Sequence, residues 1–266
     1  MDILKLKGRV TLKFLRWMER KVYNGSDAVT TIHKVFYDTI VGRFKIPEKL
    51  HVIPNFVDTE LYHETEWEGV LDEDVFPKNN SIKLLYAGNI GRMQSWEPLM
   101  ELAEKTQELN VEYFVIGEGT KRQYVEEEKQ RLKLDNLHLL PYQSRELMPA
   151  ILSYSDLSFI FMKPEKDNDS FPSKVYTIMA CQRPLLVLSG KDTPIVNFLQ
   201  DKGCAKIITE QDFERKVDEM ATWLSKVTKE ELKEMGKKGL DIIQKKYTKE
   251  KVTEMYVRLV DELTMG

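Results

Sequence analysis

The chain has 266 residues, of which 42% are hydrophobic and 31% are charged, and this length can bury one large core or two modest ones. Its net charge of −3 is unlike the basic balance of a general nucleic-acid-binding protein, so nucleic acid is not an expected partner. The sequence holds no run of about 18 apolar residues that would cross a membrane and no apolar signal-peptide core at its N-terminus. We therefore expect a globular protein in the cytoplasm.

The cysteine and histidine residues show no pattern of metal ligands. Cys181 and Cys204 lie in apolar stretches, which indicates reduced residues that pack in a core. The histidines are scattered, and only His33, after a β-branched run, stands where a cleft between two domains would expose it. Residues 167–169 have the spacing of a D-x-D motif, which holds a metal with a nucleotide diphosphate, but a solvated turn is the favoured interpretation. We expect no metal site.

The N-terminal stretch is basic and amphipathic. Residues 2–21 carry seven basic side chains against two acidic ones, interleaved with apolar residues. The basic residues are Lys5, Lys7, Arg9, Lys13, Arg16, Arg20 and Lys21. Such a helix would lie on an anionic membrane surface, where each basic residue adds up to about 1 kcal/mol, or pack on the next domain with a solvated basic face. Periodicity alone leaves both interpretations open.

The segments that follow are short. Residues 27–32 form a β-branched run, residues 34–44 have the pattern of a helix, and residues 50–53 form a brief strand. An irregular acidic stretch and a turn cluster come next. We therefore place a domain boundary between about residues 55 and 80.

From Ile82 onward, apolar runs alternate regularly with helical stretches. Six runs have the length and the continuously apolar character of buried parallel strands. In chain order they read IKLLYAG, EYFVIG, LHLLP, LSFIFM, PLLVLS and AKIIT. This alternation predicts an α/β domain with a six-stranded, doubly wound parallel sheet and helices on both faces. The tail from Phe213 to Leu263 carries three helical segments.

The loops after the first two strands carry residues suited to a phosphate. In doubly wound sheets, ligands bind beyond the carboxyl ends of the strands. Gly88 and Gly91 follow the first strand, where a backbone can approach a phosphate closely and Arg92 can reach it. Gly117 and Gly119 repeat the arrangement after the second strand. A G-x-G-x-x-G motif is absent from the sequence, which argues against a nicotinamide cofactor.

The third and fourth loops add a base contact and a helix start. The exposed backbone around Tyr142 would read a base edge. Residues 169–174 lead into a helix that begins near Ser173 and Lys174. Its first turn would offer free N–H groups and a positive dipole end to a phosphate, and Lys174 would strengthen that site. A capped surface helix with a solvated lysine is the alternative for this stretch alone, but four such loops at one sheet edge favour nucleotide binding.

Six blocks of the sequence together resemble a known family. They are DAVTTIHKVFYDTI with IPEKLHVIPNFVDTELY, LLYAGNIGRMQSWEPL, FVIGEGTKRQYVEEE, LLPYQSRELMPAILSYSDLSFI, PSKVYTIMACQRPLLV and YTKEKVTEMYVRLVDEL. Their order is typical of the retaining glycosyltransferases of family 4, which have the GT-B fold. The resemblance looks closest to members that transfer acetamido-deoxy sugars such as N-acetylfucosamine in surface-polysaccharide synthesis. It extends from about Asp27 to the end of the chain.

The resemblance implies a nucleotide-sugar donor, UDP-linked, and transfer with retention to a saccharide or polyprenyl-linked acceptor, without a cofactor or an essential metal. Electrostatic stabilisation of the departing diphosphate would carry the catalysis. By position, residues 88–92 would line the diphosphate, the backbone near Gly117 and Tyr142 would flank the base, and residues 169–174 would hold the sugar and phosphates. The expected catalytic residues are Lys174, Arg92 and Asp169. The expected donor-binding residues are Gly88, Asn89, Gly91, Gly117, Pro141, Tyr142, Ser173 and Thr177.

Two departures from the family's pattern concern charged residues. Asn89 and Gln94 stand where many members have basic phosphate clamps, and the nearby basic side chains at 92 and 174 would substitute. The family's paired glutamates correspond to Asp169 and Thr177. A hydroxyl at 177 can replace only part of the hydrogen bonding of a carboxylate to a ribose.

The third departure is length. A complete GT-B enzyme has two Rossmann-like domains and roughly 350 to 400 residues, whereas this chain starts near the last strand of the first domain, as an N-terminally truncated chain would. We expect a remnant of the acceptor domain at 1–60, a linker at 61–81, the donor-binding domain at 82–246 and a crossover helix at 247–266. The crossover helix would leave apolar residues partly exposed, namely Val252, Met255, Tyr256 and Leu259.

Three functions remain open. The first is a glycosyltransferase chain, either with a separate subunit that supplies the acceptor domain or as the remnant of a longer gene. The second is a non-catalytic nucleotide-sugar-binding subunit or inactive remnant. The third is a structural or regulatory domain without ligand, which the four loops at the sheet edge argue against. The basic N-terminal helix fits the first function, because polysaccharide assembly commonly uses lipid-linked acceptors. A peripheral location on the inner membrane face is therefore an expectation.

Overall fold

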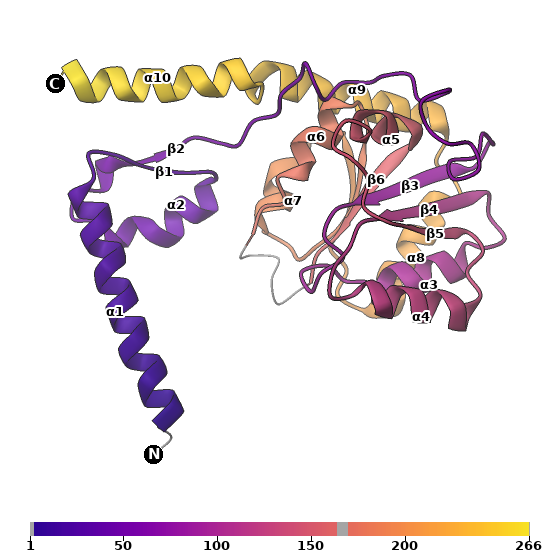
Figure 1. Ribbon diagram of the computed structural model, residues 1–266, viewed down its shortest axis with the longest axis horizontal. Helices are drawn as coiled ribbons and strands as arrows, with labels where there is room; N and C mark the ends of the chain where they lie inside the picture. The colour runs from indigo at the N-terminus through magenta and orange to yellow at the C-terminus, as the bar shows by residue number, and fades with distance from the viewer. Residues whose placement is uncertain (1–2, 164–169, 266) are drawn as a thin grey trace. The chain divides into compact units, whose positions relative to one another are not determined.

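The computed structural model describes residues 3–163 and 170–265, which divide into two compact units (Figure 1). One unit comprises the residues up to Phe56 together with those from Lys249 on, and the other runs from Val57 to Thr248. Each unit has its own hydrophobic cluster. In the part of the chain that the structure describes, no helix is long and apolar enough to cross a membrane.

The first unit pairs two short parallel strands with helices. Its elements are α1 (Ile3–Gly25), β1 (Val29–Thr31), α2 (Lys34–Ile40), η1 (Val41–Arg43), η2 (Pro47–Lys49), β2 (Leu50–Val52) and α10 (Lys249–Met265). Val29 of β1 lies opposite Leu50 of β2. His33 is the N-cap of α2, where its Nδ1 accepts a hydrogen bond of 3.2 Å from the backbone N–H of Val35.

The final helix buries part of its apolar face within this unit. Val252 and Leu259 are buried in a cluster with Ile53, which follows β2 directly. Met255 and Tyr256 are 38% and 41% exposed. The prediction of partial exposure was therefore wrong for Val252 and Leu259, because the end of the β1–β2 segment covers them, and it is confirmed for Met255 and Tyr256.

The second unit is a parallel sheet covered on both sides. Its strands are β3 (Ile82–Ala87), β4 (Val111–Ile116), β5 (Leu137–Leu140), β6 (Leu157–Phe161), β7 (Leu185–Leu188) and β8 (Ala205–Ile208). Its helices are α3 (Glu97–Lys105), α4 (Arg122–Leu132), α5 (Met148–Tyr154), α6 (Lys174–Ala180), α7 (Pro194–Leu199), α8 (Phe213–Leu224) and α9 (Lys229–Lys246). Helix α3 packs with α8 on one side, and α6 with α9 on the other (Figure 1).

The six apolar runs of the sequence are the six strands of this sheet, so the predicted α/β fold with a doubly wound parallel sheet is confirmed. The strands lie in the order β5-β4-β3-β6-β7-β8 and all pairs are parallel. The strand order reverses between β3 and β6. The ladder between these two strands pairs only Leu84 with Leu157 and Leu85 with Ser158, so their carboxyl ends separate. Doubly wound sheets bind ligands at such a switch point.

Residues 61–81 contain no helix or strand, yet they pack against the sheet unit. The rings of Trp67 and Phe76 contact Tyr154 edge to face, with centroids 5.0 and 5.2 Å apart. Glu64 forms an ion pair with Arg183 at 2.5 Å. These contacts attach the segment to the second unit.

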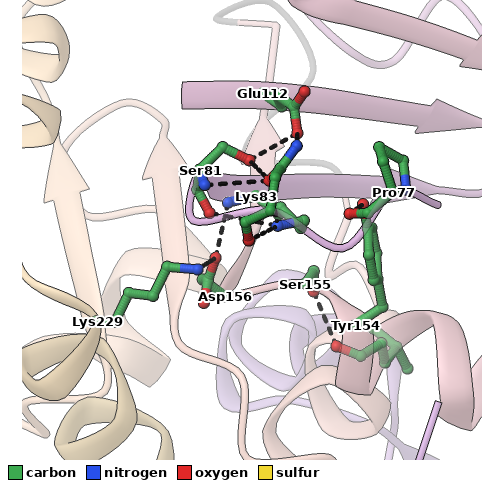
Figure 2. Close-up of polar contacts among 10 residues, drawn as sticks. Pro77, Ser81, Lys83, Glu112, Tyr154, Ser155, Asp156 and Lys229 are labelled. Carbon is green, nitrogen blue, oxygen red and sulfur yellow. Dashed lines mark hydrogen bonds and ion pairs between the residues drawn. The ribbon is translucent and has the colours of Figure 1, made fainter. Parts of the chain in front are cut away.

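A polar cluster occupies the edge of the sheet where the strands begin (Figure 2). The ammonium of Lys83, a residue that is only 4% exposed, donates to the side-chain oxygen of Asn79 at 2.8 Å. Asp156 accepts the backbone N–H of Lys83 at 2.8 Å and pairs with Lys229 at 3.3 Å. Glu112, on β4, accepts hydrogen bonds from Asn79 at 3.1 Å and from Ser81 at 2.6 Å. These bonds satisfy charges that the fold buries at this edge.

Candidate functional site

A pocket with a volume of about 180 Å³ lies at the switch point of the sheet. Its walls come from the ends of β3 and β4, from β6, from α5 and α6, and from the loop after β5. Four of the predicted site residues line it, namely Gly88, Tyr142, Lys174 and Thr177. We call it the switch-point pocket.

Lys174 places a cation in this pocket. Its Nζ donates a hydrogen bond of 3.3 Å to the backbone oxygen of Ala87 and lies 3.6 Å from the ring centroid of Tyr86. Because burial disfavours the charged form, the pKa of Lys174 is lowered to about 7. An added Cβ at Gly88 would lie in ordinary van der Waals contact with Nζ, at 3.4 Å, so the ammonium lies directly beside this glycine at the end of β3. The pocket therefore holds an amine whose charged form an anionic ligand would favour.

Tyr86 is buried beneath the lysine. Its hydroxyl donates a hydrogen bond of 2.7 Å to the backbone oxygen of Asn89, and its ring contacts Trp96 and Phe159 with centroids 5.0 and 5.6 Å apart. Burial raises the pKa of Tyr86, so the phenol stays neutral at physiological pH. Sequence reasoning missed this residue, because it reads as one more apolar position of a strand.

The glycines of the first two loops let the loops pack backbone to backbone. Gly88 and Gly117 have φ of +142° and +140°, values that residues with a side chain rarely adopt. A Cβ on Gly117 would lie 2.0 Å from the oxygen of Gly88, and a Cβ on Gly119 would lie 2.4 Å from the oxygen of Ile90. Gly117 is buried and lies outside the pocket wall, which its neighbour Ile116 lines. Close packing of loops is thus the role that the geometry gives Gly117.

Three further predicted residues of the first loop lie outside the pocket wall. Asn89 is exposed, and the oxygen of buried Gly91 accepts a hydrogen bond of 2.9 Å from the indole of Trp96. Arg92 is exposed and lines a separate open concavity together with Lys121 and Lys163. The structure therefore brings Lys174, and not Arg92, to the switch point.

Helix α6 begins at Lys174, as predicted, but its first turn is largely satisfied. Ser173 is the N-cap with φ −59° and ψ −22°, and its side chain makes no capping hydrogen bond. The N–H groups of Val175 and Tyr176 bond to the oxygens of Pro172 and Ser173 at 3.1 Å each. The first turn thus has few free N–H groups, and the lysine side chain is the clearer anion contact. Asp169 lies outside the described residues.

The remaining predicted residues lie at the pocket or next to it. The ring of Tyr142 is 73% exposed at the pocket mouth. The oxygen of the exposed Pro141 accepts a hydrogen bond of 3.1 Å from Gln143, another lining residue. Thr177 donates its hydroxyl proton to the oxygen of Lys174 at 2.9 Å, so its own oxygen is left as an acceptor for a ligand.

Arg122 is a second residue that sequence reasoning missed. Its Nη1 donates to the oxygen of Gly117 at 2.7 Å and to the oxygen of Leu140 at 2.9 Å. These carbonyls end β4 and β5, so the guanidinium joins the two strands at the edge that carries the pocket. The sequence signals a helix here, but not that its first side chain folds back onto two strands.

Within residues 3–163 and 170–265, no group of three or more His, Cys, Asp and Glu side chains is placed to hold a metal ion. The two cysteines are free and buried, as predicted.

Comparison with protein families decides the classification. Residues 71–241 match the model described as "Glycosyl transferases group 1", and residues 2–61 match "Glycosyltransferase Family 4". The chain belongs to the group 1 glycosyl transferases. The predicted glycosyltransferase family and the predicted GT-B type of α/β fold are thereby confirmed, whereas the retaining mechanism and the acetamido sugar stay predictions.

Individual relatives agree with this assignment. The chain is 26% identical over 179 residues to the "Putative colanic acid biosynthesis glycosyl transferase WcaI" of Escherichia coli, covering 66% of this chain and 44% of the relative. Among solved structures, Anabaena Alr3699/HepE with UDP and glucose matches with a TM-score of 0.70 at 14% identity, over 92% of this chain and 66% of that one. Sucrose-phosphate synthase from Thermosynechococcus elongatus matches with a TM-score of 0.71 at 15% identity, over 95% and 62%. The chain thus spans less than half the length of the curated relative and about two thirds or less of these structures.

Proposed function

We propose that the switch-point pocket binds the diphosphate of a nucleotide-sugar and that this chain is the donor-binding part of a glycosyltransferase. The observation that carries the proposal is the ammonium of Lys174 beside the Gly88 backbone, at the point of the sheet where ligands of doubly wound folds bind. The diphosphate would lie against these two residues. The base would lie toward Ile116, Tyr142 and Gln143, which also line the pocket.

A UDP-linked sugar is the proposed donor. HepE, similar in fold, was solved with UDP and glucose, and WcaI is described as a colanic acid biosynthesis enzyme. We extend this to transfer of a hexosyl or acetamidohexosyl unit, of the N-acetylfucosamine type, to a saccharide or polyprenyl-linked acceptor in surface-polysaccharide synthesis. The sequence blocks that resemble such transferases support this extension.

In the proposed reaction, the bond between the anomeric carbon and the diphosphate oxygen breaks, and its electron pair stays on the diphosphate. An acceptor hydroxyl oxygen forms the new bond to that carbon, with retention, and its proton passes to the departing diphosphate. Protonated Lys174 would stabilise the charge that develops on the leaving group, which is the contribution that preorganised cations make in water-poor sites. Arg92 and Asp169 remain proposed contributors from the neighbouring loops.

The acceptor side of the reaction needs more protein than the sheet unit offers. Because the chain spans 44% of its curated relative, we propose that an acceptor domain comes from further sequence or from a separate subunit. Nucleotide-sugar binding without transfer is the alternative function.

We also propose that α1 contacts an anionic membrane surface. Its described side chains include apolar residues that are 44% to 61% exposed, namely Leu12, Phe14, Leu15, Trp17, Met18 and Val22. Four basic residues are interleaved with them, namely Lys13, Arg16, Arg20 and Lys21. Vesicles containing anionic lipid are expected to sediment the full chain but not the chain without residues 1–21. Equal sedimentation of both would contradict the contact.

Calorimetric titration with UDP, GDP and a UDP-N-acetylhexosamine tests the proposed donor. We expect UDP and the UDP-sugar to bind and GDP to bind more weakly or not at all. A chain that is folded by circular dichroism and binds none of the three would contradict the proposal. An assay of sugar transfer to an acceptor, with the proposed acceptor domain added, distinguishes the two functions. Transfer would show an enzyme, and binding without transfer would show a binding subunit.

A further inference from the structure

The ammonium of Lys174 rests on an aromatic face. Its Nζ is 3.6 Å from the ring centroid of Tyr86 and has one hydrogen bond of 3.3 Å, to the oxygen of Ala87. Within residues 3–163 and 170–265, no carboxylate forms an ion pair with it. A cation over a tyrosine face at this distance is stabilised by the ring quadrupole.

We infer that Tyr86 is a positioning residue that favours the charged form of Lys174 and holds its ammonium in the switch-point pocket until a diphosphate binds it. This inference rests on the proposed function and adds a residue to it. The ring favours the cation without supplying a negative charge, so an incoming diphosphate has no carboxylate to displace. The buried position of Tyr86, fixed by its bond to Asn89 and by Trp96, keeps the ring in place.

Binding should then be linked to protonation of the lysine. Among the residues that the structure describes, the titratable groups that line the pocket besides Lys174 are the phenols of Tyr62, Tyr86 and Tyr142. Burial lowers the pKa of Lys174 to about 7, and a bound diphosphate would raise it. The affinity for a diphosphate is therefore expected to be highest below pH 7 and to fall as the pH rises above 7. Without the ring the lysine pKa would be lower still, so the fall would begin at a lower pH.

A measurement on the ligand-free chain tests the contact itself. In NMR spectra of the chain with 13C-labelled lysine, the ε-CH2 signal of Lys174, assigned by its loss in Lys174→Met, should be shifted upfield by the ring and should titrate near pH 7. Tyr86→Phe, which keeps the aromatic face, should preserve both properties. Tyr86→Met, which fills the space without a ring, should remove the upfield shift and lower the titration midpoint by about half a unit to one unit. Tyr86→Leu serves as a second ring-free variant if Tyr86→Met does not fold.

A binding measurement then tests what the contact does. UDP-glucose and inorganic pyrophosphate are titrated between about pH 6 and 8.5, and the UDP-sugar is the main probe because a terminal phosphate titrates near pH 6. We expect Tyr86→Met to bind about three- to tenfold more weakly than the native chain at about pH 8 and nearly equally at about pH 6. Tyr86→Phe should follow the native profile.

The outcomes separate the inference from the proposed function. An unchanged lysine signal and midpoint in the ring-free variants would overturn the inference even if UDP-glucose binds. A pH profile of binding that does not change without the ring would also overturn it. The expected NMR result with no binding of either probe would overturn the proposed function, and with it the role given to Tyr86.

Discussion

At the scale of single residues, the charge on Lys174 is the feature on which the proposed donor binding rests. Lys174→Met removes the cation and keeps the apolar stem, so affinity for UDP should fall about ten- to hundredfold at neutral pH, the range of a lost charge-assisted contact. Lys233→Met, which removes an exposed lysine of α9, is the matched control and should bind UDP as the native chain does. Equal affinities of the two variants, measured by calorimetry, would show that the lysine is not a phosphate contact.

Glu112 makes stability depend on pH at the opposite edge of the sheet. His138, whose Nε2 lies 3.6 Å from the carboxylate, and the hydrogen bonds from Ser81 and Asn79 lower the pKa of Glu112 from 4.5 to about 2. Because the folded state binds the proton less readily than the unfolded state, this stabilisation is present above about pH 4.5 and is lost as the pH falls toward 2.

Glu112→Gln should therefore lower the free energy of unfolding by about 1–3 kcal/mol at pH 7 and by less near pH 3. Urea denaturation at the two pH values measures this difference. Glu234→Gln, at an exposed ion pair of α9, is the control and should leave the free energy of unfolding nearly unchanged at both pH values. A loss for Glu112→Gln that is the same at both pH values would contradict the assigned cause.

At the scale of elements, the packing of the β3 and β4 loops sets the geometry of the pocket edge. Gly117→Ala combines a φ of +140° with a Cβ only 2.0 Å from the oxygen of Gly88. We expect it to lower stability by at least about 2 kcal/mol in urea denaturation. Gly69 also has a positive φ, of +74°, but an added Cβ there would meet no atom within 4 Å. Gly69→Ala should therefore lower the free energy of unfolding by only about 1 kcal/mol. Equal costs would mean that strain alone, and not the loop contact, matters at 117.

The elements themselves were predictable from the sequence, because each strand of the sheet is a short apolar run and each is followed by a helical pattern. The start of α6 at Lys174 was predictable for the same local reason. The partners of its side chain were not, since Tyr86 lies on a strand 88 positions earlier, and only the fold places the two together. Arg92 shows the converse: its position after β3 was predicted, but its side chain lines another concavity.

At the scale of the whole molecule, the chain consists of two units that carry different features. The sheet unit carries the pocket and its cation, while the smaller unit carries the exposed basic helix and the final helix. The proposed donor binding therefore needs only the sheet unit, and we propose that acceptor recognition belongs to protein beyond it. The sequence blocks resemble one class of sugar transferases, but they do not reveal which residues select the sugar, because sugar hydroxyls are distinguished by a few contacts that no spacing pattern encodes.

The central claim, that the switch-point pocket binds a nucleotide diphosphate through Lys174, is tested most directly by a crystal structure of the chain with UDP. We predict a phosphate oxygen within about 3 Å of the Lys174 Nζ and the uracil near Tyr142. The Nζ would move away from the ring of Tyr86 to make the phosphate contact. UDP bound instead in the open concavity of Arg92, Lys121 and Lys163, with the switch-point pocket empty, would contradict the claim.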